Sequence, residues 1–147
     1  MNKAFVRDPD STVERCPHCG TAGQPVGTAI LNEFVRPEAR IQLGEEANFC
    51  PSANCPVAYF DAFDRRVEVA QLARPVFPKD PAAPICECFG FACAEIDEDV
   101  REGVATRTRA HIERARSSEA RCSQSAANGQ SCVANVQRYF MKRRGTV

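Results

Sequence analysis

The sequence predicts an α+β fold made of two small units, and three observations support this prediction. Residues 12–74 mix strand-like and helix-like patterns, whereas residues 85–142 show helical periodicity. A proline-rich segment at residues 75–84 separates the two. No stretch approaches the roughly 18 consecutive apolar residues that a membrane span requires.

The segment 75–84 is predicted to connect the units as a spacer. Proline stands at positions 75, 78, 81 and 84, and this three-residue period is typical of polyproline II. Such a spacer is semi-rigid and extends by about 3 Å per residue. The same segment can also dock to a proline-recognition domain, but the spacer is our default interpretation.

Residues 12–74 are expected to form a short helix, a second helical turn and a small antiparallel sheet. Thr28 can cap the helix, with Phe34 on its apolar face, and Pro37 suits the first position of the next turn. Residues 57–60 and 67–69 have the composition and alternation of strands.

Residues 85–142 are expected to form helices. Ile96 and Val100 share a helix face before Gly103, which suits a helix C-terminus. Thr106 can cap a helix that extends to about residue 116. A last helix should present an apolar face made of Val133, Val136 and Phe140.

The nine cysteines are expected to bind metal rather than to form disulfides. The first eight residues contain no apolar segment or cleavage site of a secretory signal, so we expect a reducing, cytoplasmic compartment. In such a compartment, regularly spaced thiols are more often metal ligands than disulfides. Nine divides into two sets of four with one cysteine left over.

The first set consists of Cys16, Cys19, Cys50 and Cys55. A Cys-x2-Cys turn directs two sulfurs to one point, and a second pair completes the tetrahedron that structural zinc prefers. A single iron accepts the same four sulfurs, so zinc is the favoured metal and iron the alternative. Four protein ligands leave no open position for activating water, which argues against a catalytic zinc.

The second set consists of Cys86, Cys88, Cys122 and Cys132. The Cys-x-Cys spacing is too tight for an ordinary zinc knuckle. It suits one edge of a [2Fe–2S] cluster, which needs four thiolates and accepts ligands far apart in sequence. Two phenylalanines beside the pair can shield such a cluster from water.

Residues 48–60 and 84–90, followed by Cys122 and Cys132, resemble the N-terminal region of CopZ-type copper chaperones over about residues 14–142. The resemblance implies a zinc-binding α+β module followed by a helical [2Fe–2S]-binding module, with the first cysteine set on zinc and the second on the cluster. The cluster unit is also similar to bacterioferritin-associated ferredoxins, although its last two cysteines are further apart.

The resemblance implies a role in electron transfer or in copper-type metal handling. Full-length family members carry copper on a separate C-terminal heavy-metal-associated domain, which these 147 residues lack. We therefore expect no copper transfer by that route. A metal-trafficking accessory that passes copper, mercury or a cluster to a protein partner is a second hypothesis. A zinc-only interaction module that binds nucleic acid or a protein partner is a third.

Basic residues are concentrated near the C-terminus. Residues 101–147 contain ten Lys and Arg against three Glu, a net charge of +7. These arginines can line solvated helix faces or offset an anionic metal centre. A nucleic-acid footprint is the less favoured interpretation, because no aromatic residues alternate with them to stack on bases.

The remaining chemically distinctive residues are interpreted as structural. Cys93 is expected to be an inert buried thiol, with a substitute ligand or a redox-active neighbour as alternatives. His18 is expected to be an exposed turn residue, although it can replace a cysteine ligand, and His111 is expected to be a surface residue. The acidic run at residues 97–99 is expected to form a solvated helix face. No phosphate-binding loop or nucleophile elbow is present, so we do not expect an enzyme.

Overall fold

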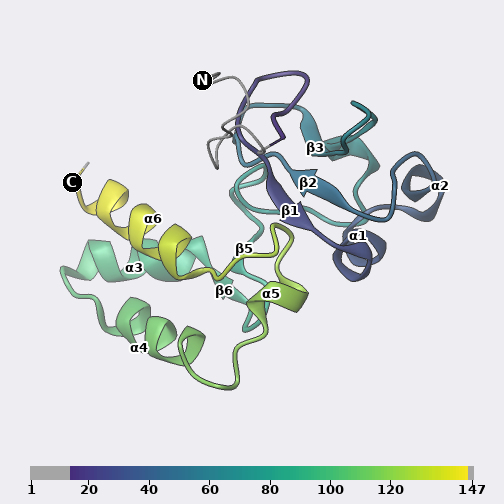
Figure 1. The fold of residues 1–147 in the computed structure, drawn as a ribbon. Coiled ribbons are helices and arrows are strands. Elements are labelled where there is room, and N and C mark those ends of the chain that lie inside the picture. Colours follow the sequence, from purple (N-terminus) through teal and green to yellow (C-terminus); the bar gives the residue numbers. More distant parts are fainter. Residues whose placement is uncertain (1–13, 146–147) are drawn as a thin grey trace, which may run out of the picture.

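The computed structural model describes residues 14–145, except for the side chains of Cys122 and Ser123. Helices and antiparallel sheets form two adjoining units, which confirms the α+β class (Figure 1). The first unit contains β1 (Gln24–Val26), α1 (Thr28–Phe34), α2 (Pro37–Arg40), β2 (Ala47–Phe49), β3 (Val57–Phe60), β4 (Arg66–Glu68) and a 3-10 turn at Val69–Gln71. The second contains β5 (Pro84–Cys86), β6 (Phe91–Ala92), α3 (Cys93–Glu102), α4 (Thr106–Ala115), α5 (Cys122–Ser125) and α6 (Val133–Gly145).

The first unit is built on a four-stranded antiparallel sheet with the order β1-β2-β3-β4. Every residue of β2 and β3 is buried. Apolar side chains of α1 form one core cluster with Phe49, Ala58 and Tyr59, whereas Val57 and Phe60 belong to a second cluster with three of the cysteines. The predicted strand at 57–60 is confirmed. The strand predicted at 67–69 begins one residue earlier and ends at Glu68, because Val69 starts the 3-10 turn.

The helix predicted after Thr28 is confirmed, but its capping is different. Gly27 is the N-cap residue and supplies no side chain, while the Thr28 hydroxyl donates to the Glu45 carbonyl at 2.8 Å. Thr28 therefore ties the helix start to a loop instead of capping it. The next helical turn begins at Pro37, as predicted, because proline lacks the N–H that the first turn leaves without a partner.

Residues 75–84 are not an extended spacer. Most of the segment forms turns, and Val76 and Ala83 are buried. Lys79 donates from its Nζ to the carbonyls of Ser52 and Cys55, at 2.6 and 3.1 Å. The proline period alone does not set the conformation here, because burying two apolar side chains and pairing the lysine favour a folded segment over an extended one.

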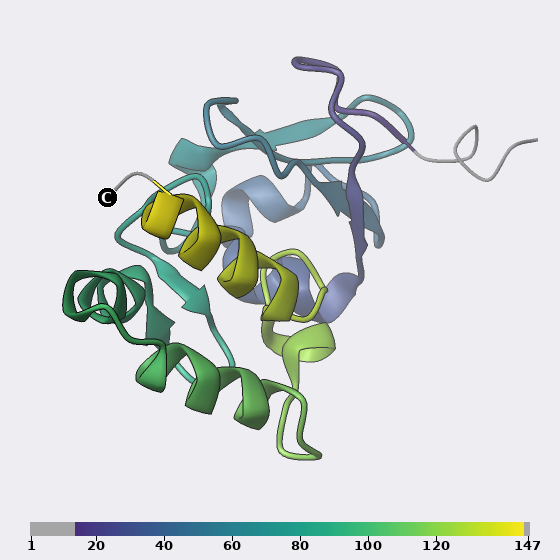
Figure 2. The same cartoon turned by 90° about the vertical axis from the view of Figure 1, so that its left-hand side faces the viewer.

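In the second unit, a β5–β6 hairpin leads into helices α3, α4 and α6, which pack on one another (Figure 2). Gly103 ends α3 with a φ of +73°, in agreement with the sequence prediction. Val136 of α6 is fully buried, as its predicted apolar face requires. In the part of the chain described here, no helix is both long and apolar enough to cross a membrane.

The segment between α5 and α6 packs against the first unit. The Tyr59 hydroxyl of β3 donates to the Ala127 carbonyl at 2.6 Å, and Ala127 belongs to the core of the first unit. A Cβ on Gly129 would lie 2.9 Å from the Pro25 carbonyl oxygen. In both views α5 lies beside α1 (Figures 1 and 2). The two units are therefore in direct contact near the second cysteine set.

Candidate metal centres

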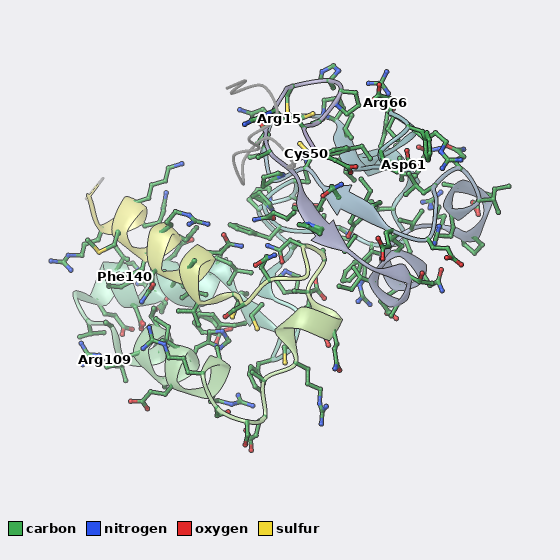
Figure 3. The ribbon with its side chains drawn as sticks, in the orientation of Figure 1. Arg15, Cys50, Asp61, Arg66, Arg109 and Phe140 are labelled. Atoms are coloured by element: carbon green, nitrogen blue, oxygen red, sulfur yellow. The ribbon has the colours of Figure 1, made fainter. Side chains whose placement is uncertain are left out.

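Four cysteines of the first unit direct their sulfurs to one point. Cys16 and Cys19 lie in the turn that precedes β1, Cys50 directly follows β2, and Cys55 comes two residues before β3. Their four sulfur atoms all lie within 4.8 Å of one another. Figure 3 labels Cys50 on this unit, far from Arg109 and Phe140 on the helical unit.

The spacing of these sulfurs suits a tetrahedral metal. The Sγ atoms of Cys16 and Cys55 are 3.8 Å apart, and those of Cys19 and Cys50 are 3.5 Å apart. A tetrahedral zinc with Zn–S bonds of 2.3 Å separates its sulfurs by about 3.8 Å. These two pairs of sulfurs therefore already lie close to the separation that one tetrahedral zinc ion requires.

The first turn is held in shape by its own backbone. Gly20 adopts a φ of +79°, which glycine reaches without steric cost, and its N–H donates to the Cys16 carbonyl at 2.9 Å. The His18 N–H donates to the Cys16 sulfur at 3.4 Å. His18 itself is exposed, as predicted, and does not belong to the group of converging sulfurs.

The thiols of this group differ in acidity. Burial raises the pKa of Cys50 to about 12 and also raises the pKa of Cys55, whereas a hydrogen bond with the Thr21 side chain lowers the pKa of Cys19 to about 6. Buried thiols of high pKa become thiolates when a cation supplies the compensating charge. Zinc binding by this group would therefore release protons.

A second group of ligand atoms lies in the helical unit and contains Cys86, His111 and Cys132, all buried, with their ligand atoms within 4.8 Å of one another. Cys86 ends β5 and Cys132 directly precedes α6. Hydrogen bonds with Cys132 and then His111 lower the pKa of Cys86 to about 4, against the effect of burial. The N-terminal end of α6 also favours a negative sulfur at Cys132.

The other two predicted ligands of this set are Cys88 and Cys122. Cys88 is partly buried and lies outside the three-residue group, and its sulfur accepts the backbone N–H of Arg121 at 3.0 Å. Cys122 begins α5, but its side chain lies outside the described residues. The structure thus brings Cys86 and Cys132 together and sets Cys88 against the residue that precedes Cys122.

His111 belongs to this second group of ligand atoms, so the prediction that it is a surface residue is wrong. The side chain is only 4% exposed, and its Nε2 lies 3.2 Å from the Cys132 sulfur. Thr108, His111 and Ala115 share one face of α4 and all three are buried, but the polar threonine and histidine give this face no apolar pattern in the sequence.

Two further predictions about single residues have opposite outcomes. Cys93 is buried, as predicted, and burial raises the pKa of its thiol to about 11, which favours the protonated form at neutral pH. The acidic run 97–99 is not a solvated face throughout, because Asp99 is completely buried between α3 and α4. Its carboxylate accepts hydrogen bonds from Thr108 and Arg107.

Comparison with known proteins agrees with this geometry. Residues 13–73 match the CopZ-type family model described as a zinc binding domain. The X-ray structure of the Archaeoglobus fulgidus CopZ N-terminal domain superimposes with a TM-score of 0.71 at 20% sequence identity, covering 85% of this chain and 96% of that chain. A search of curated proteins found no match.

These findings establish two points. The chain has the fold of a CopZ N-terminal domain, and it contains a zinc binding domain that includes the four converging cysteines of the first unit. Metal binding is therefore the property that sequence, geometry and comparison share.

Proposed function

We propose that the protein holds a structural zinc at Cys16, Cys19, Cys50 and Cys55 and a [2Fe–2S] cluster at Cys86, Cys88, Cys122 and Cys132, and that it acts in electron transfer or metal handling. The observation that carries the proposal is that four cysteines converge in the first unit, while Cys86 and Cys132 converge with His111 in the second. Because the proposed ligands are thiolates, the protein belongs in a reducing compartment such as the cytoplasm.

The residues around the second group fit a [2Fe–2S] cluster. Cys86 and Cys132 lie close enough to share one iron, and the contact of Cys88 with the Arg121 N–H brings it close to the chain position of Cys122. When bound, the cluster supplies a one-electron redox couple. Phe91 is buried beside the group and excludes water from one side.

Basic residues near Cys88 suit an anionic centre. Arg114 lies over the Phe89 ring at 4.1 Å, and Arg121 donates its backbone N–H to the Cys88 sulfur. Positive charge at this edge stabilises a four-thiolate cluster, which carries about −2 when oxidised and gains negative charge on reduction. The same charge suits a protein partner with an acidic surface.

Several arginines of the C-terminal third are already engaged within the chain. Arg107 binds Asp99 and Glu102, and Arg143 binds Asp97. These ion pairs reduce the positive charge available to a polyanion. We therefore propose a redox or metal-transfer partner for this unit rather than nucleic acid.

The test is anaerobic purification with iron supplied, followed by elemental analysis, visible absorbance and EPR on the same sample. We expect zinc and about two irons per chain. Cys132→Ser should lose iron and visible absorbance and keep zinc, whereas Cys50→Ser should lose zinc. Cys93→Ser, a matched buried cysteine outside both sets, should keep both metals.

A colourless, iron-free wild-type protein would contradict the cluster assignment. Retention of zinc by Cys50→Ser at the wild-type stoichiometry would contradict the first site. Incubation of the reduced protein with copper or mercury and an acceptor then separates metal transfer from electron transfer, since an electron carrier passes no metal.

A further inference from the structure

The structure places one imidazole against the second cysteine group. His111 lies on α4, and its ring stacks on Phe91 with centroids 4.2 Å apart and an interplanar angle of 3°. Phe89 meets the same ring edge-on at 6.0 Å. These contacts hold the imidazole plane and leave Nε2 facing Cys132, 3.2 Å from its sulfur.

The Nε2–Sγ distance of 3.2 Å is that of a hydrogen bond. Two ligands of one tetrahedral metal, with metal–nitrogen and metal–sulfur bonds of about 2.0 and 2.3 Å, would lie about 3.5 Å apart. A thiolate has no proton to give, so in contact with a Cys132 thiolate the Nε2 atom must be the donor. Because the four proposed cysteines already complete the ligand set of a [2Fe–2S] cluster, we interpret the contact as an N–H···S hydrogen bond.

The helix that carries His111 is fixed in position one turn earlier. The Asp99 carboxylate accepts the Thr108 N–H at 2.7 Å and the Thr108 hydroxyl at 2.8 Å. Thr108 and His111 are three residues apart and share a helix face. The buried contact with Asp99 therefore fixes the position of α4 along its axis and its rotation about that axis. From this position the imidazole reaches Cys132.

We propose that His111 is a positioning residue of the second metal centre, whose Nε2–H donates a hydrogen bond to the Cys132 thiolate and raises the reduction potential of the group bound there. The inference rests on the cluster proposed above. A donor beside a ligand sulfur stabilises the extra negative charge of the reduced state more than that of the oxidised state. None of the cysteine ligands is replaced by the histidine.

The test compares His111→Leu and His111→Gln with the wild type. Leucine and glutamine have similar size, but only glutamine keeps an N–H donor at the end of the side chain. We expect all three proteins to load the same amount of iron. The midpoint potential should fall in His111→Leu and return most of the way to the wild-type value in His111→Gln. His18→Ala, in the exposed zinc turn, should leave the potential unchanged.

A measurement on the wild-type protein keeps the test decisive if His111→Leu binds little iron. With ¹⁵N-labelled histidine, pulsed EPR of the reduced cluster should show a weak nitrogen coupling that disappears in His111→Gln. A strong coupling, typical of a directly bound nitrogen, or no coupling at all would overturn the inference, as would equal potentials in the wild type and both His111 variants. A wild type without iron would instead refute the proposed cluster.

Discussion

Asp99 is a buried carboxylate of α3 that accepts hydrogen bonds from the start of the neighbouring helix α4. It lies on α3 and accepts the Thr108 N–H near the start of α4, where no side chain of α4 itself provides a cap. Burial alone would raise its pKa, but hydrogen bonds from Thr108 and Arg107 outweigh this effect, and the pKa of Asp99 is lowered. The ionised form is therefore the one that stabilises the fold.

We expect Asp99→Asn to reduce the free energy of unfolding at pH 7 by about 1–3 kcal/mol. The native pKa lies below the unfolded value of about 3.9, so this stabilisation is complete above that value and is lost as the pH falls through the native pKa. Urea unfolding at pH 7 and pH 3 should thus show a difference between wild type and variant that shrinks at pH 3. Glu113→Gln, an exposed charge change on α4, is the control, and a pH-independent difference would contradict the account.

Predictions about single residues succeeded where neighbouring residues in the chain determine a side chain's environment. They failed where a distant segment determines it. The cysteine spacing gave the four converging sulfurs of the first unit, because each pair is set by a short turn. The burial of Asp99 and His111 depends on how α3, α4 and α6 pack. Neither residue differs in its near sequence from an ordinary surface residue.

The junction between α3 and α4 depends on a backbone conformation that favours glycine. Gly103 has a φ of +73°, and a Cβ added there would meet no atom within 4 Å. Gly103→Ala should therefore lose stability through the backbone alone, by about 1 kcal/mol. Thermal unfolding would measure this loss.

Two further variants test whether the left-handed backbone conformation of Gly103 causes this loss of stability. Gly103→Asn should cost less than alanine, since asparagine tolerates the left-handed region better. Gly145→Ala, in the last turn of α6 where a Cβ also meets no atom within 4 Å, should be neutral or stabilising. Equal losses at the two alanine positions would show that the left-handed conformation is not the cause.

Helix and strand positions followed from periodicity, while the caps did not. α1, α3, α4 and α6 lie where apolar spacing placed them, because each buries one face. Thr28 and Thr106 both resemble N-caps in sequence, yet each is the first residue of its helix, and the caps are Gly27 and Ala105. For Thr28, the hydroxyl donates to the Glu45 carbonyl instead of capping the helix.

The whole molecule is held together by contacts between the two units. Burial raises the pKa of Tyr59, so its phenol keeps a proton and donates to the Ala127 carbonyl. This contact joins the central sheet of the first unit to the segment between Cys122 and Cys132. The zinc-binding unit therefore supports the segment that connects two proposed cluster ligands.

Tyr59→Phe should lower the free energy of unfolding by about 1–3 kcal/mol, because the Ala127 carbonyl loses its buried donor. It should also speed hydrogen exchange of the Gly129 amide, which bonds to the Ala126 carbonyl in the same segment. Tyr139→Phe removes a hydroxyl that bonds Asp97 inside the second unit and should leave that amide unchanged. Unaltered Gly129 exchange in Tyr59→Phe would show that the contact does not hold the segment.

The sequence by itself determined the α+β class, helices α1, α3, α4 and α6, strands β3 and β4, and the first set of four thiols, because short-range periodicity and tight turns act within a few residues. It did not predict β1, β2 or the β5–β6 hairpin, which begins a unit expected to be helical. Only the tertiary structure decided that residues 75–84 fold onto the first unit, that Ala127 joins its core, and that His111 lies against Cys132. Those outcomes depend on which apolar surfaces bury one another from water, and these surfaces are formed by residues far apart in the chain.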